Sequence, residues 1–280
     1  MKNTIIFDNK IDFKQGETLT FFLNENFDFR AESRIFSAQT LNKIQVYLKN
    51  LKSNKIKNKI ISFDISEKNK ALFIIVKEKL LPNDFEKMGA NFFSYVKMSK
   101  ISKINFYSNT LKLVKFYQKN TELISNFIHG FNLKSYSFDK YKTKDKNNYY
   151  FSLKIISSEK TSLSKNYSKY KAIESGVFQT RDLVSEPPNV LYPKKYVETI
   201  KKLSSLGLKI QVYNESRMKR LGMHSLLGVG QGSINESFLV TIEWKGNKKS
   251  KERPLAFVGK GVCFDTGGIS LKPAKFMEEM

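Results

Sequence analysis

Residues 257–280 read FVGKGVCFDTGGISLKPAKFMEEM and carry most of the chemical information in the chain. The apolar run at 254–258 predicts a buried strand that ends at the following glycine. Lys260, Asp265 and Lys272 follow within thirteen residues, among glycines that allow the backbone to approach another group closely. In an open α/β sheet, the carboxyl end of a strand faces the crevice that binds ligands. Lys260 and Asp265, five residues apart on such a turn, are placed so that they could converge on one point; from the residues alone, a surface ion pair on a loop is the favoured alternative.

Other kinds of site find little support in the sequence. A Walker loop needs Gly-Lys followed by Ser or Thr, whereas glycine and valine follow Lys260. The GVGQGS stretch at 228–233 resembles a dinucleotide fingerprint, but Ser233 takes its third glycine position and strand-like residues follow. His129 and His224 are the only histidines and are isolated, which argues against a histidine-based site. Cys263 stands between two apolar residues and is interpreted as packing.

Upstream of the glycine-rich stretch, helix and strand signals alternate. A long helix is expected over 164–184, and it ends before Pro187 because proline disfavours helical conformation in the residue that precedes it. After it we expect helices at 196–206 and 215–221 and strands at 209–213, 225–229, 238–244 and 255–258. We therefore divide the chain into an N-terminal domain (1–160), a connector helix (161–186) and a second α/β domain (187–280).

Residues 1–160 contain short runs of Ile, Val, Phe and Tyr separated by polar turns. Expected strands are 18–23, 44–48, 60–65, 72–77, 104–107 and 149–156, and expected helices are 83–97 and 110–127. Strands that alternate with helices predict an open α/β sheet. No motif in this part carries chemistry, and the basic run at 140–148 is interpreted as an exposed loop.

Composition narrows the possible partners. The net charge of +23 is spread evenly, +13 over residues 1–150 and +10 over 151–280, and only six residues are arginine, which argues against a dedicated nucleic-acid partner. The single cysteine excludes an intrachain disulfide and fits a reducing compartment. The first ten residues lack the apolar core of a signal peptide, and the strongest apolar run, 71–76, is far shorter than the ~20 residues that span a bilayer. We expect a soluble, cytoplasmic protein without a membrane partner.

Three stretches resemble the leucyl (cytosol) aminopeptidase family, whose members are exopeptidases with two zinc or manganese ions. VGKGVCFDTGGISLKP followed by MEEM, at 258–280, resembles the family signature. TRDLVSEPPNVLY at 180–192 and LGMHSLLGVGQGS at 221–233 resemble two further family segments in the expected order. Residues 1–160 match only in length and α/β character, as expected of the family's variable N-terminal domain. The resemblance implies an N-terminal open α/β sheet domain, a connector helix and the first part of an α/β metallo-exopeptidase catalytic domain.

The resemblance also implies roles for particular residues. Lys260 and Asp265 would be metal ligands, with Asp265 binding both ions. Lys272 would be the catalytic lysine that binds the substrate carbonyl oxygen and the oxyanion formed from it. Met280 would lie at the wall of the pocket for the N-terminal side chain of the substrate. The two lysines then need opposite protonation states, because only a neutral amine binds a metal whereas a cation stabilises an oxyanion.

The implied activity is the metal-dependent removal of N-terminal amino acids, with a leucine-type preference, from peptide substrates by a homo-oligomer, a hexamer in the family. The family pattern also needs an aspartate about three residues beyond Met280 and a later segment that carries two more carboxylates and a catalytic arginine. The 280 residues do not include them, so we expect a truncated chain that is inactive alone and folds poorly in its C-terminal half. The alternatives are a non-catalytic remnant or a split-gene subunit that acts in assembly and, less favoured, a nucleic-acid-binding protein.

Overall fold

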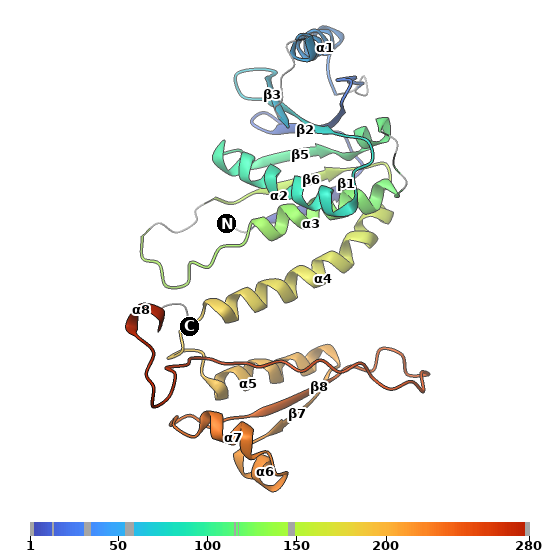
Figure 1. Ribbon diagram of the computed structural model, residues 1–280. Helices are drawn as coiled ribbons and strands as arrows, with labels where there is room; N and C mark the ends of the chain where they lie inside the picture. Colours follow the sequence, from blue (N-terminus) through green and yellow to red (C-terminus); the bar gives the residue numbers. More distant parts are fainter. Residues whose placement is uncertain are drawn as a thin grey trace. The chain divides into compact units, whose positions relative to one another are not determined.

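The computed structural model describes residues 3–12, 14–30, 35–53, 59–114, 116, 118–144 and 149–277. The chain divides into two compact units, Met1–Arg181 and Asp182–Met280. Both units mix helices and strands (Figure 1), which confirms the α/β class predicted from the sequence. No helix in the described ranges is long and apolar enough to cross a membrane.

The first unit is built on a six-stranded sheet of order β1-β6-β5-β2-β4-β3. All neighbouring strands are parallel except β3, which pairs antiparallel with β4 at one edge. Central strands such as β2 and β4 are apolar along most of their length because helices cover both of their faces. The strands are β1 (Thr4–Asp8), β2 (Thr18–Asn24), β3 (Ile60–Asp64), β4 (Lys70–Val76), β5 (Lys103–Tyr107) and β6 (Ser152–Ile156).

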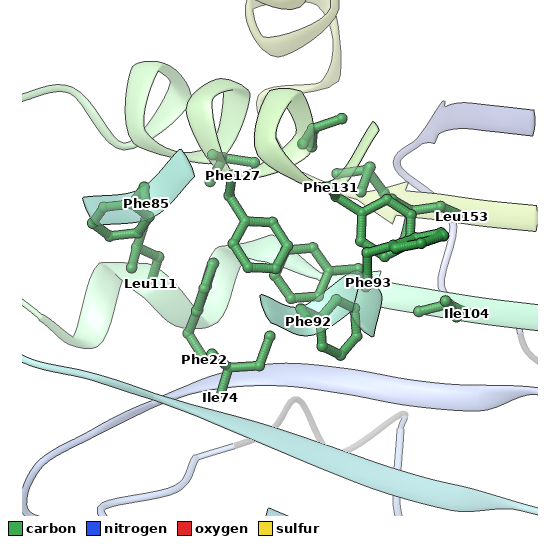
Figure 2. Packing of buried hydrophobic residues seen from close by; sticks show 14 of the residues in the cluster. Phe22, Ile74, Phe85, Phe92, Phe93, Ile104, Leu111, Phe127, Phe131 and Leu153 are labelled. Atoms are coloured by element: carbon green, nitrogen blue, oxygen red, sulfur yellow. The ribbon is translucent and has the colours of Figure 1, made fainter. Parts of the chain in front are cut away.

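Helices pack on both faces of this sheet. On one face lie α2 (Pro82–Met98), α3 (Asn120–Lys134) and the beginning of α4 (Lys160–Ser185), over a core rich in phenylalanine (Figure 2). On the other face, α1 (Ala38–Ser53) covers a second apolar cluster. The short 3₁₀ helix η1 (Ser108–Leu113) follows β5, and the hydroxyl of Thr110 accepts a hydrogen bond of 2.8 Å from the backbone N–H of Phe22 in β2.

Helices α2 and α3 approach each other closely at two glycines. A Cβ atom added to Gly89 would lie 1.9 Å from the carbonyl oxygen of Phe127, and one added to Gly130 would lie 1.8 Å from that of Glu86. Ordinary carbon–oxygen contacts are far longer, so no side chain larger than hydrogen fits at either position. The two glycines thus set the distance between the helices that cover the core.

The contact between α3 and α4 is polar instead. Glu174 of α4 is 2% exposed, and its carboxylate accepts hydrogen bonds from Asn132 Nδ2 at 2.6 Å and from the Tyr167 hydroxyl at 2.9 Å. His129 Nδ1 lies 2.9 Å from the other carboxylate oxygen. Burial first, and then the charge of Glu174, raises the pKa of Tyr167, which keeps its hydroxyl protonated as a donor. Further contacts along the same line of α4 are Asn166 to Thr121, Asn126 to Tyr170 and Arg181 to the carbonyl of Leu133.

The second unit is smaller and buries few apolar side chains. Strands β7 (Lys209–Tyr213) and β8 (Leu239–Glu243) form an antiparallel pair. In the part of this unit that the structure describes, Val197 and Met218 are the buried large apolar residues. Its helical segments are α5 (Pro193–Lys201), η2 (Lys202–Leu206), α6 (Glu215–Arg220), α7 (His224–Gly230) and α8 (Ala274–Met277).

Several predicted elements were wrong. The strand expected at 44–48 lies within α1, where Ile44 and Leu48 are one helical turn apart and both buried. The strand expected at 225–229 lies within α7, since a short apolar run does not distinguish strand from helix. The helix expected at 110–127 is divided between two elements, η1 and α3. Residues 255–258 pair with no described strand and are exposed, and β1 was not predicted.

Candidate functional site

The glycine-rich stretch forms a tight turn between Asp265 and Lys272. The backbone N–H of Gly267 donates a 2.8 Å hydrogen bond to Asp265 Oδ1, and that of Lys272 donates one of 2.8 Å to the carbonyl of Thr266. Gly267 and Gly268 have φ angles of 96° and 88°, in the left-handed region that residues with a Cβ rarely adopt. The two consecutive glycines therefore allow the chain to reverse direction here.

This turn brings the side chains of Asp265 and Lys272 together. Lys272 Nζ donates to Asp265 Oδ2 at 3.0 Å, with side-chain exposures of 26% and 47%. The Gly267 N–H is the largest cause that lowers the pKa of Asp265, followed by the hydrogen bond and charge of Lys272. The carboxylate is thus held ionised by a donor on each oxygen.

Lys260 lies in an exposed segment without regular secondary structure that precedes the turn. Its charge is the smallest of the causes that lower the pKa of Asp265. Within the described ranges, no hydrogen bond or ion pair joins Lys260 to Asp265; the lysine that pairs with Asp265 is Lys272, and this ion pair is partly exposed on a loop. Met280, the fourth expected site residue, lies outside the described residues.

Cys263 lies two residues before Asp265 and is partly buried. Burial raises the pKa of its thiol, so less of it is thiolate at neutral pH than in a free cysteine. A nucleophilic cysteine needs the opposite shift, which supports a packing role for this side chain.

The donors at the turn do not make up a complete metal site. The described part of the chain contains no group of three or more His, Cys, Asp or Glu side chains that could hold a metal ion. Zinc takes four ligands in structural sites, and manganese sites are commonly octahedral. One carboxylate whose two oxygens already accept hydrogen bonds, with one lysine amine, falls short of both.

Comparison with known proteins identifies the region that contains the turn. Residues 178–280 match the family described as "Cytosol aminopeptidase family, catalytic domain". A probable cytosol aminopeptidase of Rhizobium etli is 47% identical over 161 residues, which are 56% of this chain and 32% of the relative. One of Phytoplasma mali is 45% identical over 166 residues, 58% of this chain and 33% of the relative. The matches thus span about a third of the length of these curated relatives and confirm the family resemblance.

Solved structures with the same fold are similar over nearly the whole chain. A mutant of tomato leucine aminopeptidase has a TM-score of 0.73 at 20% identity and covers 95% of this chain and 55% of its own. The bottromycin maturation enzyme BotP in complex with Mn has a TM-score of 0.65 at 19% identity, and the match covers 93% of this chain and 51% of BotP. At sequence identities of about 20%, these matches show a shared fold, which agrees with the α/β class of this chain.

Proposed function

Because residues 178–280 match the catalytic domain of the cytosol aminopeptidases, we propose that this chain supplies the N-terminal domain and the first part of the catalytic domain of a metal-dependent aminopeptidase. Its substrates are peptides from which it removes N-terminal residues, with a leucine-type preference. The observation that carries the proposal is the 265–272 turn, where glycines at left-handed φ angles set Asp265 and Lys272 face to face at 3.0 Å. The turn thus brings a carboxylate and a cationic amine together at one place.

In this proposal each side chain of the turn has a distinct role. Asp265 and Lys260 are ligands of two divalent ions, manganese or zinc, in the complete enzyme. Lys272 stays cationic, donates to the substrate carbonyl oxygen and stabilises the negative charge that develops on it, an effect typically worth 10²–10³ in kcat for one donor. Met280 borders the pocket for the N-terminal side chain of the substrate.

We further propose that the 280-residue chain does not turn over substrate by itself. One carboxylate and one amine leave a divalent ion mostly hydrated, so additional carboxylates and an arginine are required to complete the site. The complete enzyme is proposed to be a cytoplasmic homo-oligomer, with the chain divided into an N-terminal domain (1–160), a connector helix (161–186) and a partial catalytic domain (187–280).

A second candidate is a subunit that acts in assembly, as a remnant or as one product of a split gene. The observation that favours it is the exposed apolar surface along residues 255–271, where Phe257 is 89%, Val258 100% and Leu271 64% exposed. Large exposed apolar side chains that gather in one segment are typical of interaction sites.

The test compares the chain alone with a fusion that adds the complementary C-terminal part of the Phytoplasma mali relative. With leucyl-p-nitroanilide and Mn²⁺, the chain alone should release no product and the fusion should release it. Lys272→Met in the fusion should lower kcat about a hundredfold or more, whereas Lys209→Met, far from the turn in sequence, should not. A fusion that folds and binds Mn²⁺ yet shows no turnover would refute the proposal.

Supplying the C-terminal part as a separate polypeptide distinguishes the two candidates. Activity that appears on mixing supports a split enzyme, in which the exposed apolar segment at 255–271 joins the two pieces. Complex formation without activity supports the assembly role. Turnover by the 280-residue chain alone at ordinary enzyme rates would contradict the proposed incompleteness of its site.

A further inference from the structure

A cavity of about 170 Å³ lies at the carboxyl-terminal edge of the sheet in the first unit. In the sheet register, Asp8, Ile156 and Tyr107 stand side by side where β1, β6 and β5 end. The cavity is lined by residues at these ends and by residues in the connections that follow them. Open α/β sheets bind ligands in the crevice outside the carboxyl ends of their strands, so the cavity lies where such a site is expected.

The cavity also lies where the strand order reverses. From β2 the chain continues through α1 to β3 and β4 on one side, whereas from β5, the neighbour of β2, it continues through η1 and α3 to β6 on the other side. Ile35 belongs to the connection between β2 and α1, and Asn109 to the connection between β5 and α3; both line the cavity. Ligand sites of doubly wound sheets occur preferentially at such points.

One part of the lining is apolar. Ile11, Ile35, Tyr107 and Ile156 belong to the apolar cluster on the face of the sheet that α1 covers. The ring of Tyr107 stacks on that of Phe21, with 5.0 Å between the centroids and 15° between the planes. These side chains offer apolar contact to the faces of a bound ring.

The other part of the lining is polar. Asn109 Oδ1 accepts hydrogen bonds from the backbone N–H and the hydroxyl of Ser158 at 3.1 and 3.0 Å, which leaves the NH₂ group of the same amide to donate to a bound molecule. The Thr110 hydroxyl is held by backbone groups of β2 and β5 at 2.8 and 2.9 Å. Asn9 supplies a second, exposed amide. The fold thus positions most of these polar groups before a ligand binds.

The charge of the lining limits the chemistry of the ligand. Of the described residues that line the cavity, none is charged. Asp8 and Glu159, which adjoin lining residues in sequence, pair with Lys154 at 3.2 Å and with Lys112 at 3.1 Å. An amino acid or a phosphate would bring charges that this lining leaves uncompensated, and a wholly apolar molecule would leave the amides and hydroxyls without partners. The ligand that fits is uncharged, with apolar faces and a polar edge.

We propose that this cavity binds a nucleobase, free or as part of a nucleoside. A base is uncharged, and its edge carries donors and acceptors side by side, which side-chain amides match in pairs. Proteins that bind single bases combine such hydrogen bonds with stacking against aromatic or apolar side chains. The volume of about 170 Å³ is below the roughly 300–1,000 Å³ of sites for larger ligands, so one ring system fits and a sugar stays outside. The proposal uses no residue of the 265–272 turn, so its outcome leaves the proposed peptidase function untouched.

The test follows the isoleucine methyl groups of the full 280-residue chain by NMR, because isoleucines line the cavity. Adenosine, inosine, cytidine and uridine are the probes, since uncharged molecules do not respond to the net charge of +23. At least one should bind with a Kd on the order of 1 mM, as expected for a ligand of this size. It should shift the methyl resonances of Ile11, Ile35 and Ile156 and leave that of Ile128, on the other face of the sheet, unchanged.

Variants test the role of the two amides. Asn109→Asp removes the donating NH₂ group but keeps the oxygen that Ser158 binds, and it should weaken binding about tenfold. The matched control is Asn91→Asp, the same change at an exposed position of α2, which should leave the affinity unchanged. Asn9→Ala removes the exposed amide and should weaken binding about threefold. If Asn109→Asp does not fold, the methyl shifts of the unmodified chain and the affinity of Asn9→Ala decide.

Shifts at the three lining isoleucines, lost in Asn109→Asp and kept in Asn91→Asp, support the proposal. It is overturned if no nucleoside shifts these methyl groups at up to about 10 mM, or if Asn109→Asp binds as tightly as the unmodified chain. Leucine and glucose test the class of ligand, and equal shifts of the same methyl groups by either would overturn the assignment to a base. Adenosine 5′-monophosphate separates two sources of the base: tighter binding than adenosine that persists at high salt indicates a nucleotide, equal binding indicates a nucleoside, and both support a site for the base.

Discussion

Replacing Gly130 with alanine should force α2 and α3 apart and destabilise the first unit. The new Cβ would lie 1.8 Å from the carbonyl oxygen of Glu86, 2.6 Å from its carbonyl carbon and 2.9 Å from its Cα. All three atoms belong to the backbone, so no side-chain rotation relieves the clash. The helices must separate by more than 1 Å, and this disturbs the packing of Phe92 and Phe131 between them and the sheet (Figure 2).

The size of the effect follows from two opposing contributions. Overpacking of a close-packed interior costs up to about 3 kcal/mol, and a backbone clash belongs at the upper end. Alanine is favoured over glycine inside a helix by about 1 kcal/mol, which partly offsets that cost. The net prediction for Gly130→Ala is a loss of about 2 kcal/mol in the free energy of unfolding.

The control is Gly176→Ala in α4, where an added Cβ would meet no atom within 4 Å. It should stabilise the first unit by up to about 1 kcal/mol, so the two substitutions are predicted to have opposite signs. Urea unfolding followed by circular dichroism measures both. The single tryptophan, Trp244, belongs to the second unit, so its fluorescence reports that unit separately. The close contact would be refuted if Gly130→Ala proved as stable as the unmodified chain, or if Gly176→Ala proved as destabilising as Gly130→Ala.

Three further predictions concern ionisable groups. Glu174→Ala should cost about 3 kcal/mol in urea unfolding, because the buried Tyr167 hydroxyl, the buried His129 ring and the Asn132 amide lose their partner. Glu198→Ala, in an exposed pair, should leave the midpoint unchanged; similar losses would contradict the buried network. The N–H of Lys10, the Lys154 ammonium and the N–H of Asn9 lower the pKa of Asp8 from 3.8 to about 2, so its contribution is present above pH 3.8 and is lost as pH falls through about 2. Asp8→Asn should therefore lower Tm at pH 7 and flatten its fall between pH 4 and pH 2; an unchanged profile would refute this. Cys263, whose thiol pKa is raised by burial, should react with a disulfide reagent more slowly in the folded chain than in urea, and equal rates would show an open thiol.

The sequence predicted the fold best where one physical effect dominates. The runs that became β2 and β4 are apolar almost without interruption, because both of their faces are covered, and their positions were predicted to within two residues. The prediction failed at Ile44 and Leu48, whose spacing of four is helical but whose β-branched and apolar neighbours favour a strand. The edge strand β1 was not predicted, although strands of the same length, β5 and β7, were.

Of the candidate site, the sequence predicted the turn but not the ion pair within it. The glycines indicated a tight turn, but they did not tell which lysine would meet Asp265. The partner is Lys272, seven residues away, because the left-handed angles at Gly267 and Gly268 fold the chain back on itself. No local pattern pairs His129 with Glu174, which are 45 residues apart. One signal was available, since Glu174 stands seven residues after buried Tyr167 and thus on the same helical face.

The polar contact between α3 and α4 fixes the register of the two helices and restricts which residues can change along them. Helices that meet through apolar surfaces can slide past each other and repack. A shift of α4 along α3 by one turn, about 5.4 Å, would instead carry the Glu174 carboxylate out of reach of Asn132 and His129. Only one register of α3 against α4 therefore keeps these hydrogen bonds. In related chains we expect the hydrogen-bonded pairs to covary: Asn126 should change together with Tyr170, and Thr121 together with Asn166. Such paired replacements would show that the contact between the two helices is maintained in evolution.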